Sequence, residues 1–169
     1  MNRDDLGILI ERQIPRLRRY AHALMQDRQQ ADDLVQDCLD QAWRRLHRWQ
    51  PAQDLRVWLF SILHNLHANS VKAFLPWNSD PTTAATRHRG TWEQGGAADL
   101  GAIESGLAQL ARDHHEVLVL VCVEEMNYEQ AAAVLGVPVG TVIARLHGAR
   151  EQLRDSMNRE RRTSLRRVK

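Results

Sequence analysis

The sequence predicts an all-α protein built from two small helical domains that are joined by a flexible linker. Apolar residues recur at steps of three and four along most of the chain, which is the period of helices with one buried face. No stretch shows the strict alternation of a half-buried strand. Between residues 75 and 99 the period disappears, and proline, glycine and small polar residues accumulate, as in a linker. The predicted domains are therefore residues 1–74 and 100–169.

Three helices are predicted in the N-terminal domain. The first covers residues 5–26 and should break at Pro15, because proline removes a backbone donor and clashes with the preceding turn. The second covers residues 29–48, with Cys38 and Trp43 on its apolar stripe, and ends before Pro51. Asp54 is expected to cap the third helix. This helix is predicted to run from Leu55 to about Phe74 and to bury Trp58, Leu59, Ile62, Leu63 and Leu66.

The C-terminal domain is predicted to hold a helix-turn-helix. One helix should run from Leu100 to Leu110 and a second from His114 to Glu125. Asn127 then offers an N-cap, and Gly136 ends the next helix, because glycine tolerates the left-handed backbone at that point. A turn of about four residues leads into a last helix, from Val139 to about Met157. Two short helices joined in this way, the second bearing arginines, are typical of a helix-turn-helix.

Charge and composition narrow the class of protein. Residues 75–142 carry three basic and nine acidic residues, whereas residues 143–169 carry nine basic and three acidic ones. A basic end is typical of a nucleic-acid contact. No apolar run approaches the roughly 18 residues that cross a bilayer, and the N-terminus does not resemble a secretory signal, so we expect a cytoplasmic protein without membrane insertion. Cys38 and Cys122 are expected to be buried free thiols, because neither belongs to a CxxC pair.

The helix-turn-helix segment carries the residue types that a DNA contact needs. Paired alanines in the first helix allow the second helix to cross closely, and Thr141 begins the second helix, where free N–H groups can meet phosphate. Arg145 and Arg150 can donate to phosphates and base edges. An ordinary helical hairpin with a solvated basic face is the alternative interpretation.

Four segments resemble the extracytoplasmic-function (group 4) sigma factors, in the order in which that family has them. Residues 127–154, NYEQAAAVLGVPVGTVIARLHGAREQLR, resemble region 4.2, and residues 107–125, LAQLARDHHEVLVLVCVEE, resemble region 4.1. The stretch from Tyr20-Ala21 through Leu34–Asp37 resembles regions 2.1 and 2.2, and VWLFSI at 57–62 with Asn65 resembles regions 2.3 and 2.4. The resemblance implies a promoter-specificity subunit of RNA polymerase, with no catalytic residue and no cofactor. The eight histidines show no ligand set with zinc spacing, so no metal is expected.

The resemblance also implies three sets of site residues. The set expected to bind the β′ clamp helices of core RNA polymerase is Asp32, Asp33, Gln36, Asp37 and Arg44, together with Arg45 on the same helix. The set expected to open and read the −10 element of promoter DNA is Trp49, Arg56, His64, Asn65, Asn69 and Lys72. The set expected at the −35 element is Thr141, Ala144, Arg145, His147, Arg150 and Arg154. Region 4 is further expected to contact the polymerase β flap.

Three positions of the last helix depart from the family pattern. Ile143, Ala144 and Gly148 stand where the family usually has a basic residue, serine and arginine. Because each phosphate contact contributes a salt-dependent share of affinity, −35 recognition is expected to be weaker or altered in sequence. A glycine in mid-helix also costs about 1 kcal/mol relative to alanine, which predicts a locally softer helix.

An anti-sigma factor is an expected partner, because it could hold together the apolar and acidic faces of the two tethered domains and cover both. The alternative function is a stand-alone helix-turn-helix transcriptional regulator, whose DNA footprint would persist without polymerase. An enzyme is disfavoured, since the sequence has no glycine-rich phosphate loop, nucleophile motif or metal set. The regulon, the inducing signal, the anti-sigma partner and the promoter sequence do not follow from the sequence.

Overall fold

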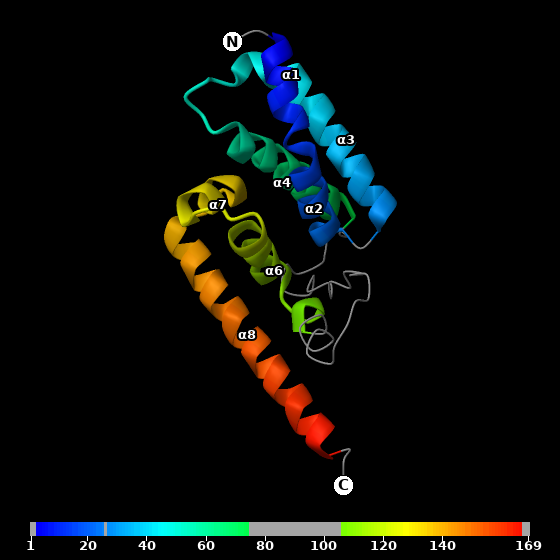
Figure 1. Cartoon of the computed structure of the whole chain (residues 1–169), viewed down its shortest axis with the longest axis vertical. Coiled ribbons are helices and arrows are strands. Elements are labelled where there is room, and N and C mark those ends of the chain that lie inside the picture. Colours follow the sequence, from blue (N-terminus) through cyan, green and yellow to red (C-terminus); the bar gives the residue numbers. More distant parts are fainter. Residues whose placement is uncertain (1–2, 26, 75–105, 167–169) are drawn as a thin grey trace.

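The described part of the structure consists of helices joined by short turns and loops, without strands. The computed structural model describes residues 3–25, 27–74 and 106–166, so the predicted linker and its boundaries lie outside the described residues. The N-terminal bundle comprises α1 (Arg3–Glu11), α2 (Ile14–Leu24), α3 (Arg28–Arg45) and α4 (Leu55–Phe74), and the C-terminal bundle comprises α6 (Arg112–Leu118), α7 (Tyr128–Leu135) and α8 (Val139–Arg166) (Figure 1). The predicted all-α class is confirmed.

The predicted break in the first helix is confirmed, but it lies earlier than expected. Arg12 and Gln13 form a turn between α1 and α2, and Pro15 falls in the first turn of α2. Proline is well tolerated there, because the first N–H groups of a helix have no partner within it. The apolar side of α2, including Leu17, Tyr20 and Leu24, is buried.

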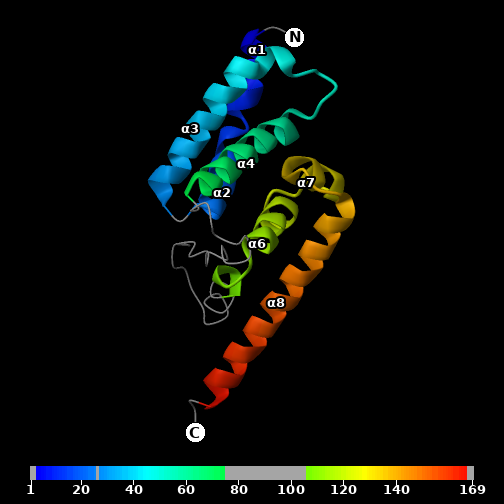
Figure 2. The same ribbon diagram turned by 180° about the vertical axis from the view of Figure 1, so that it is seen from behind.

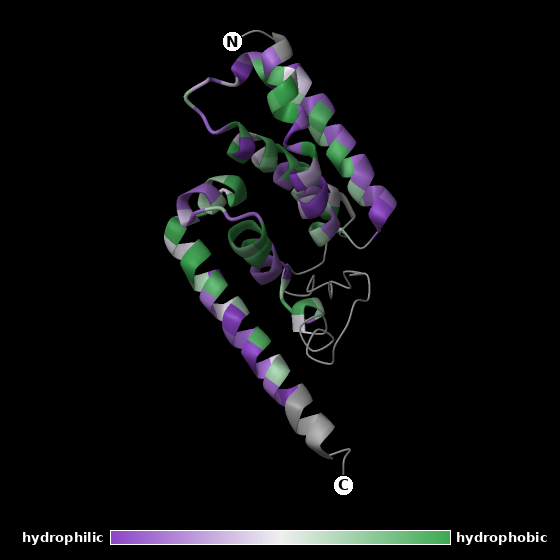
Figure 3. Cartoon of the chain, in the orientation of Figure 1, coloured by the Kyte–Doolittle hydropathy of each residue, from purple (hydrophilic) through white to green (hydrophobic). Residues whose placement is uncertain are grey.

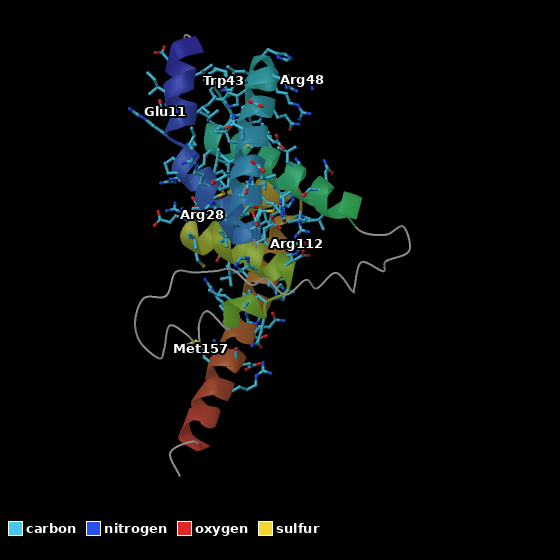
Figure 4. The ribbon with its side chains drawn as sticks, turned by 90° about the vertical axis from the view of Figure 1, so that its right-hand side faces the viewer. Glu11, Arg28, Trp43, Arg48, Arg112 and Met157 are labelled. Atoms are coloured by element: carbon cyan, nitrogen blue, oxygen red, sulfur yellow. The ribbon has the colours of Figure 1, made fainter. Side chains whose placement is uncertain are left out.

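Helix α3 is shorter than predicted, and one residue on its stripe is not in the core. Asp27 Oδ1 accepts from Gln30 N at 2.9 Å, which caps the start of α3. The helix ends at Arg45, and a 3-10 turn follows at Leu46–Arg48. Trp43 is 38% exposed and lies against α1, where a Cβ added to Gly7 would be 3.6 Å from its ring (Figure 4). Trp43 therefore covers α1 instead of filling the interior of the bundle.

Helix α4 has the predicted bounds and the predicted cap. Asp54 Oδ1 accepts from Arg56 N at 2.9 Å. Leu59 and Leu63 are fully buried, whereas Trp58 and Leu66 are only partly buried. Phe60, which lies off the predicted stripe, is also buried, and its ring stacks on Tyr20 with the ring centroids 5.1 Å apart. A second buried side arises because α4 packs against α3 in its own bundle and against α7 in the other.

The helix predicted over His114–Glu125 changes type part-way. After α6, residues Val119–Val123 form a π-helical turn. Glu124 N donates to Val119 O at 2.9 Å, and Met126 N donates to Leu120 O at 3.0 Å. Glu125 then has a φ of 53°, in the left-handed region that non-glycine residues rarely adopt. The wider turn ends the helix early and leaves Glu124 buried.

The predicted helix-turn-helix is confirmed. Asn127 and Gln130 form a reciprocal capping box, with Asn127 Oδ1 accepting from Gln130 N at 2.7 Å and Gln130 Oε1 accepting from Asn127 N at 3.0 Å. Gly136 ends α7 with a φ of 64°. Helices α7 and α8 meet at 101°, and α8 continues to Arg166, well beyond the predicted end near Met157. Of the helix predicted over residues 100–110, the described part is helical at 106–108.

The two bundles lie against each other. Helix α4 packs on α7, and α2 contacts the π-helical turn (Figures 1 and 2). A groove of about 440 Å³ between them is lined by residues of both bundles, among them Val57, Trp58 and Ala133. Helix α8 is apolar where it crosses α7 and becomes more hydrophilic along its middle. Its C-terminal part extends beyond the other helices (Figure 3). These contacts between the bundles were not predicted from the sequence.

Among the described residues, no single helix has the length and apolar character needed to cross a membrane; the bent pair α7 and α8 meets the criterion by length and composition only.

Candidate nucleic-acid and polymerase interfaces

One face of α8 is exposed and carries most of the residues predicted to contact the −35 element. Val142, Leu146 and Ala149 are buried, which turns the opposite side of the helix outward. That outward face holds Ile143, Ala144, His147, Arg150 and Arg154, and Thr141 is half-buried in the first turn. Ile143 is 48% exposed, although isoleucine is normally a core residue.

Arg145 differs from the other members of the −35 set. Its Nη2 lies 2.8 Å from Asp113 Oδ2 of α6, and its side chain is 26% exposed. Sequence spacing did not predict this pair, because the two residues come from different helices. Arg145 therefore ties α8 to α6 in this conformation.

Gly148 has a packing role. A Cβ at this position would lie 2.9 Å from Cε1 of His114, closer than side chains normally approach. The His114 ring also places Nδ1 3.1 Å from Gln152 Oε1, one turn further along α8. The glycine therefore makes room for the ring of His114 between α6 and α8.

The set predicted to bind polymerase lies together on the exposed side of α3. Asp32, Asp33, Gln36, Asp37 and Arg44 are all exposed. Asp32 Oδ1 lies 3.3 Å from His22 Nε2 and 3.9 Å from Arg18 Nε. A hollow of about 320 Å³ borders this face and is lined by Asp37, Asp40, Gln41, Arg44, Arg45 and Leu66.

The set predicted to bind the −10 element is divided between two sides of α4. Asn65 and Asn69 are exposed and one turn apart. Arg56 and His64 instead face the C-terminal bundle. Trp49 is half-buried after the 3-10 turn, and the side chain of Lys72 lies outside the described residues.

Two buried glutamates of the C-terminal bundle contact the side of α4 that carries Arg56 and His64. Glu116 is 3% exposed and Glu124 is 1% exposed. Tyr20 O–H donates to Glu116 Oε1 at 2.8 Å, and His64 Nδ1 lies 2.6 Å from the same oxygen. Because an ionised carboxylate only accepts hydrogen bonds, His64 Nδ1 carries the hydrogen of this contact.

The pKa values at this cluster follow from burial and from its hydrogen bonds. Burial alone would raise the pKa of Glu116, but the hydrogen bond and charge of His64 and the hydrogen bond from Tyr20 outweigh it, so this pKa is lowered. Burial, followed by the charge of Glu116, raises the pKa of Tyr20 well above its ordinary value. The cluster therefore favours a carboxylate beside a neutral phenol.

Glu124 binds two arginines of the N-terminal bundle. Arg19 Nε lies 2.6 Å from its Oε1 and Arg19 Nη2 lies 3.3 Å from its Oε2, a two-point contact that raises the pKa of Arg19. Arg56 Nη1 donates to the backbone O of Glu124 at 3.2 Å. Beside it, Gln130 Nε2 of the capping box donates to Asp54 Oδ2 at 2.8 Å. Glu116, Glu124 and Arg19 were not predicted as site residues, because their partners lie far away in the chain.

Comparison with known proteins identifies the family. Residues 10–64 match the family model described as the Sigma2 domain of PhyR, and residues 100–153 match the model described as Sigma-70, region 4. The ECF RNA polymerase sigma factor EcfG of Rhodopseudomonas palustris is 33% identical over 141 residues, which cover 83% of this chain and 78% of EcfG. The chain belongs to the ECF RNA polymerase sigma factors. The N-terminal bundle of this sigma factor is accordingly region 2, and the C-terminal bundle is region 4.

Solved structures of sigma factors share the fold of this one. The sigma factor RpoE, in complex with the anti-sigma factor NepR from Bartonella quintana, has a TM-score of 0.71 and 27% identity, covering 91% of this chain and 97% of RpoE. CnrH, in complex with the cytosolic domain of CnrY, has a TM-score of 0.67 and 26% identity, covering 93% of this chain and 90% of CnrH. The predicted family and two-domain architecture are thereby confirmed.

Proposed function

We propose that this sigma factor brings core RNA polymerase to its promoters through three surfaces. The exposed face of α3 binds the β′ clamp helices, α4 and the loop before it bind the −10 element, and the exposed face of α8 binds the −35 element, with region 4 also on the β flap. The observation that carries the proposal is the row of exposed residues on α8, the second helix of the helix-turn-helix, in a chain of the sigma family. Helices α7 and α8 of this motif meet at 101°. No catalytic residue, cofactor or metal enters this function.

The polymerase contact is supported by the charge and exposure of α3. Its acidic and amide side chains lie at helical spacing on one open face. Such a face is complementary to a basic or amide-rich helix of a partner. We assign Asp33, Gln36 and Asp37 to the centre of this contact, with Arg44 at its edge.

The −35 contact combines basic and apolar residues. Arg150 and Arg154 are exposed at spacing that puts both on the DNA side of α8, and His147 lies between them and Ile143. An exposed isoleucine suits the methyl group of thymine, which is an apolar feature of the major groove. We therefore expect a −35 element with a thymine opposite Ile143, and lower affinity than in relatives with a basic residue there.

Control by an anti-sigma factor is part of the proposal. RpoE and CnrH, which share this fold, are described in complexes with NepR and with the cytosolic domain of CnrY. We propose that a protein of this class binds the present sigma factor in the cytoplasm and holds it away from polymerase.

Run-off transcription with core RNA polymerase and a randomised promoter library tests the proposal. The wild-type chain should select promoters with both elements, and Asp33→Arg should lose binding to core polymerase. Arg150→Ala should weaken use of the selected −35 element by about tenfold, the cost of one good base or phosphate contact. Arg12→Ala, at an exposed arginine of the N-terminal bundle, serves as the control with the same charge change. A specific DNA footprint that needs no polymerase would overturn the proposal in favour of a stand-alone regulator.

A further inference from the structure

The side of α4 that faces region 4 carries two of the residues assigned to the −10 element. His64 is bonded to Glu116 and is 15% exposed in its side chain, and Arg56 is bonded to the backbone of Glu124. Arg56 Nη2 also lies 3.5 Å from Gln130 Oε1. In this arrangement, neither side chain is available to a DNA strand.

The two carboxylates find their partners across the interface. In the part of the chain that the structure describes, the side-chain hydrogen bonds of Glu116 run to Tyr20 and His64, and those of Glu124 run to Arg19. All three partners belong to region 2. A buried carboxylate without a partner is strongly unfavourable, so the burial of both glutamates is favourable only while the two regions are together.

The contact has the features of a specific interface. Two separate polar contacts cross it. They are the ion pair of Arg19 with Glu124 and the hydrogen bond between His64 and Glu116, and Tyr20 adds a second donor to Glu116. The π-helical turn and the positive φ of Glu125 fix the backbone beside Glu124. Rare backbone of this kind persists where the surrounding structure determines it and is common at functional sites.

We propose that the sigma factor closes on itself, with region 4 covering the −10 face of region 2 through Glu116 and Glu124, so that closure and binding of single-stranded −10 DNA exclude each other. The inference rests on the proposed function for the assignment of Arg56 and His64 to the −10 element. Closure lowers the apparent affinity for DNA in proportion to the fraction of closed molecules.

A distance measurement tests closure directly. Spin labels are attached at Gln29→Cys on α3 and Asn158→Cys on α8, two exposed positions, after the exposed Cys122 is replaced by serine. The unaltered interface should give one narrow distance, and Glu116→Gln with Glu124→Gln should give a broad distribution at longer distances. Arg19→Gln removes the region 2 partner of Glu124 and should also broaden the distance distribution. Glu11→Gln with Asp155→Asn removes two exposed carboxylates elsewhere and should leave the distance narrow.

Binding of a fluorescent oligothymidine, followed by anisotropy, tests whether closure covers the −10 face. If about 90% of the molecules are closed, opening by Glu116→Gln with Glu124→Gln should raise the apparent affinity about tenfold. The Glu11→Gln and Asp155→Asn control has the same net charge, so any gain it shows measures general electrostatic attraction. Adding Arg56→Ala and His64→Ala to the opened chain should abolish the gain.

Each result decides the inference. A broad distribution in the wild-type chain would overturn closure, and a narrow, unchanged distance in both Glu116→Gln with Glu124→Gln and Arg19→Gln would overturn closure through Glu116 and Glu124. A widened distance with no gain in oligothymidine binding beyond the control would overturn the covering of the −10 face. Neither measurement uses polymerase or a promoter, so failure of the proposed function, seen as loss of promoter-specific transcription by the wild-type chain, is a separate result.

Discussion

The two cysteines show how burial sets the chemistry of a single residue. The Cys38 thiol donates to Leu59 O at 3.5 Å inside region 2, and burial raises its pKa to about 12. Cys122, within the π-helical turn, is exposed, so its expected burial was wrong. Since the thiolate is the reactive form, Cys38 should be inert in the folded protein.

Iodoacetamide at neutral pH should therefore add one label to the native chain, at Cys122. Peptide mass spectrometry locates the label, and the same reaction in denaturant should modify both residues. Rapid labelling of Cys38 in the native protein would show that its burial is only transient.

Gly148 offers a second test at the scale of one residue. Alanine in place of a mid-helix glycine normally stabilises a helix by about 1 kcal/mol. Here the added methyl group meets the His114 ring at 2.9 Å, so Gly148→Ala should give no gain in the free energy of unfolding. In a His114→Ala background the gain of about 1 kcal/mol should reappear. Urea unfolding of the four chains of this cycle checks the prediction; equal gains in both backgrounds would contradict the packing role.

Residue roles were predictable from the sequence where they depend on near neighbours. Asp54, Asn127 and Gly136 act within three or four positions, and the structure places all three as helix-terminal residues, as predicted. The pairs of Glu124 with Arg19 and of Glu116 with Tyr20 join residues 105 and 96 positions apart. No spacing rule reaches that far, so these pairs and the inward turn of His64 could not be foreseen.

At the scale of elements, helix starts were predicted better than helix ends. A start has a local signal in its capping residue, whereas α6 ends in a π-helical turn, for which the sequence VLVCV gives no marker. Helix α8 passes Met157 because the residues that follow include no proline or glycine to stop it. The burial of Phe60 was missed for a different reason, since its side of α4 faces neighbours that periodicity alone does not reveal.

The capping box of α7 should matter for both the helix and the interface. Asn127→Ala removes the acceptor for Gln130 N and should lower the free energy of unfolding by about 1 kcal/mol. It also loosens the first turn of α7, from which the side chain of Gln130 donates to Asp54 of the region 2 loop. Asn127→Asp keeps a side-chain acceptor and should retain most of the stability. Chemical denaturation of the two variants checks this; equal losses in both would exclude a capping effect.

At the scale of the whole molecule, closure should depend on pH in both directions. The lowered pKa of Glu116 means that its contribution to closure is present above the ordinary carboxyl pKa and is lost as pH falls through the lowered value. The raised pKa of Tyr20 means that its contribution is present below the ordinary phenol pKa and is lost as pH rises towards the raised value. The charged or titratable groups around Glu116 are Tyr20 of α2, His64 of α4 and Arg112 of α6.

The spin-label distance should therefore be narrowest near neutral pH and broaden in acid and in alkali. In Glu116→Gln the broadening in acid should be smaller, because one of the groups that titrate there is gone. Glu11→Gln should keep the wild-type profile. An acid response that is identical in Glu116→Gln and wild type would assign it to other carboxylates.

The direction of α8 has a consequence for how the closed sigma factor binds double-stranded DNA. The helix runs away from the contact between regions 2 and 4 (Figure 1), and Ile143, Ala144, His147, Arg150 and Arg154 are exposed on it. Closure over the proposed −10 face therefore leaves the proposed −35 surface accessible. The affinity for double-stranded DNA should therefore be the same in Glu116→Gln with Glu124→Gln as in the control Glu11→Gln with Asp155→Asn, which has the same net charge. Strand opening would then be withheld until polymerase parts the two halves.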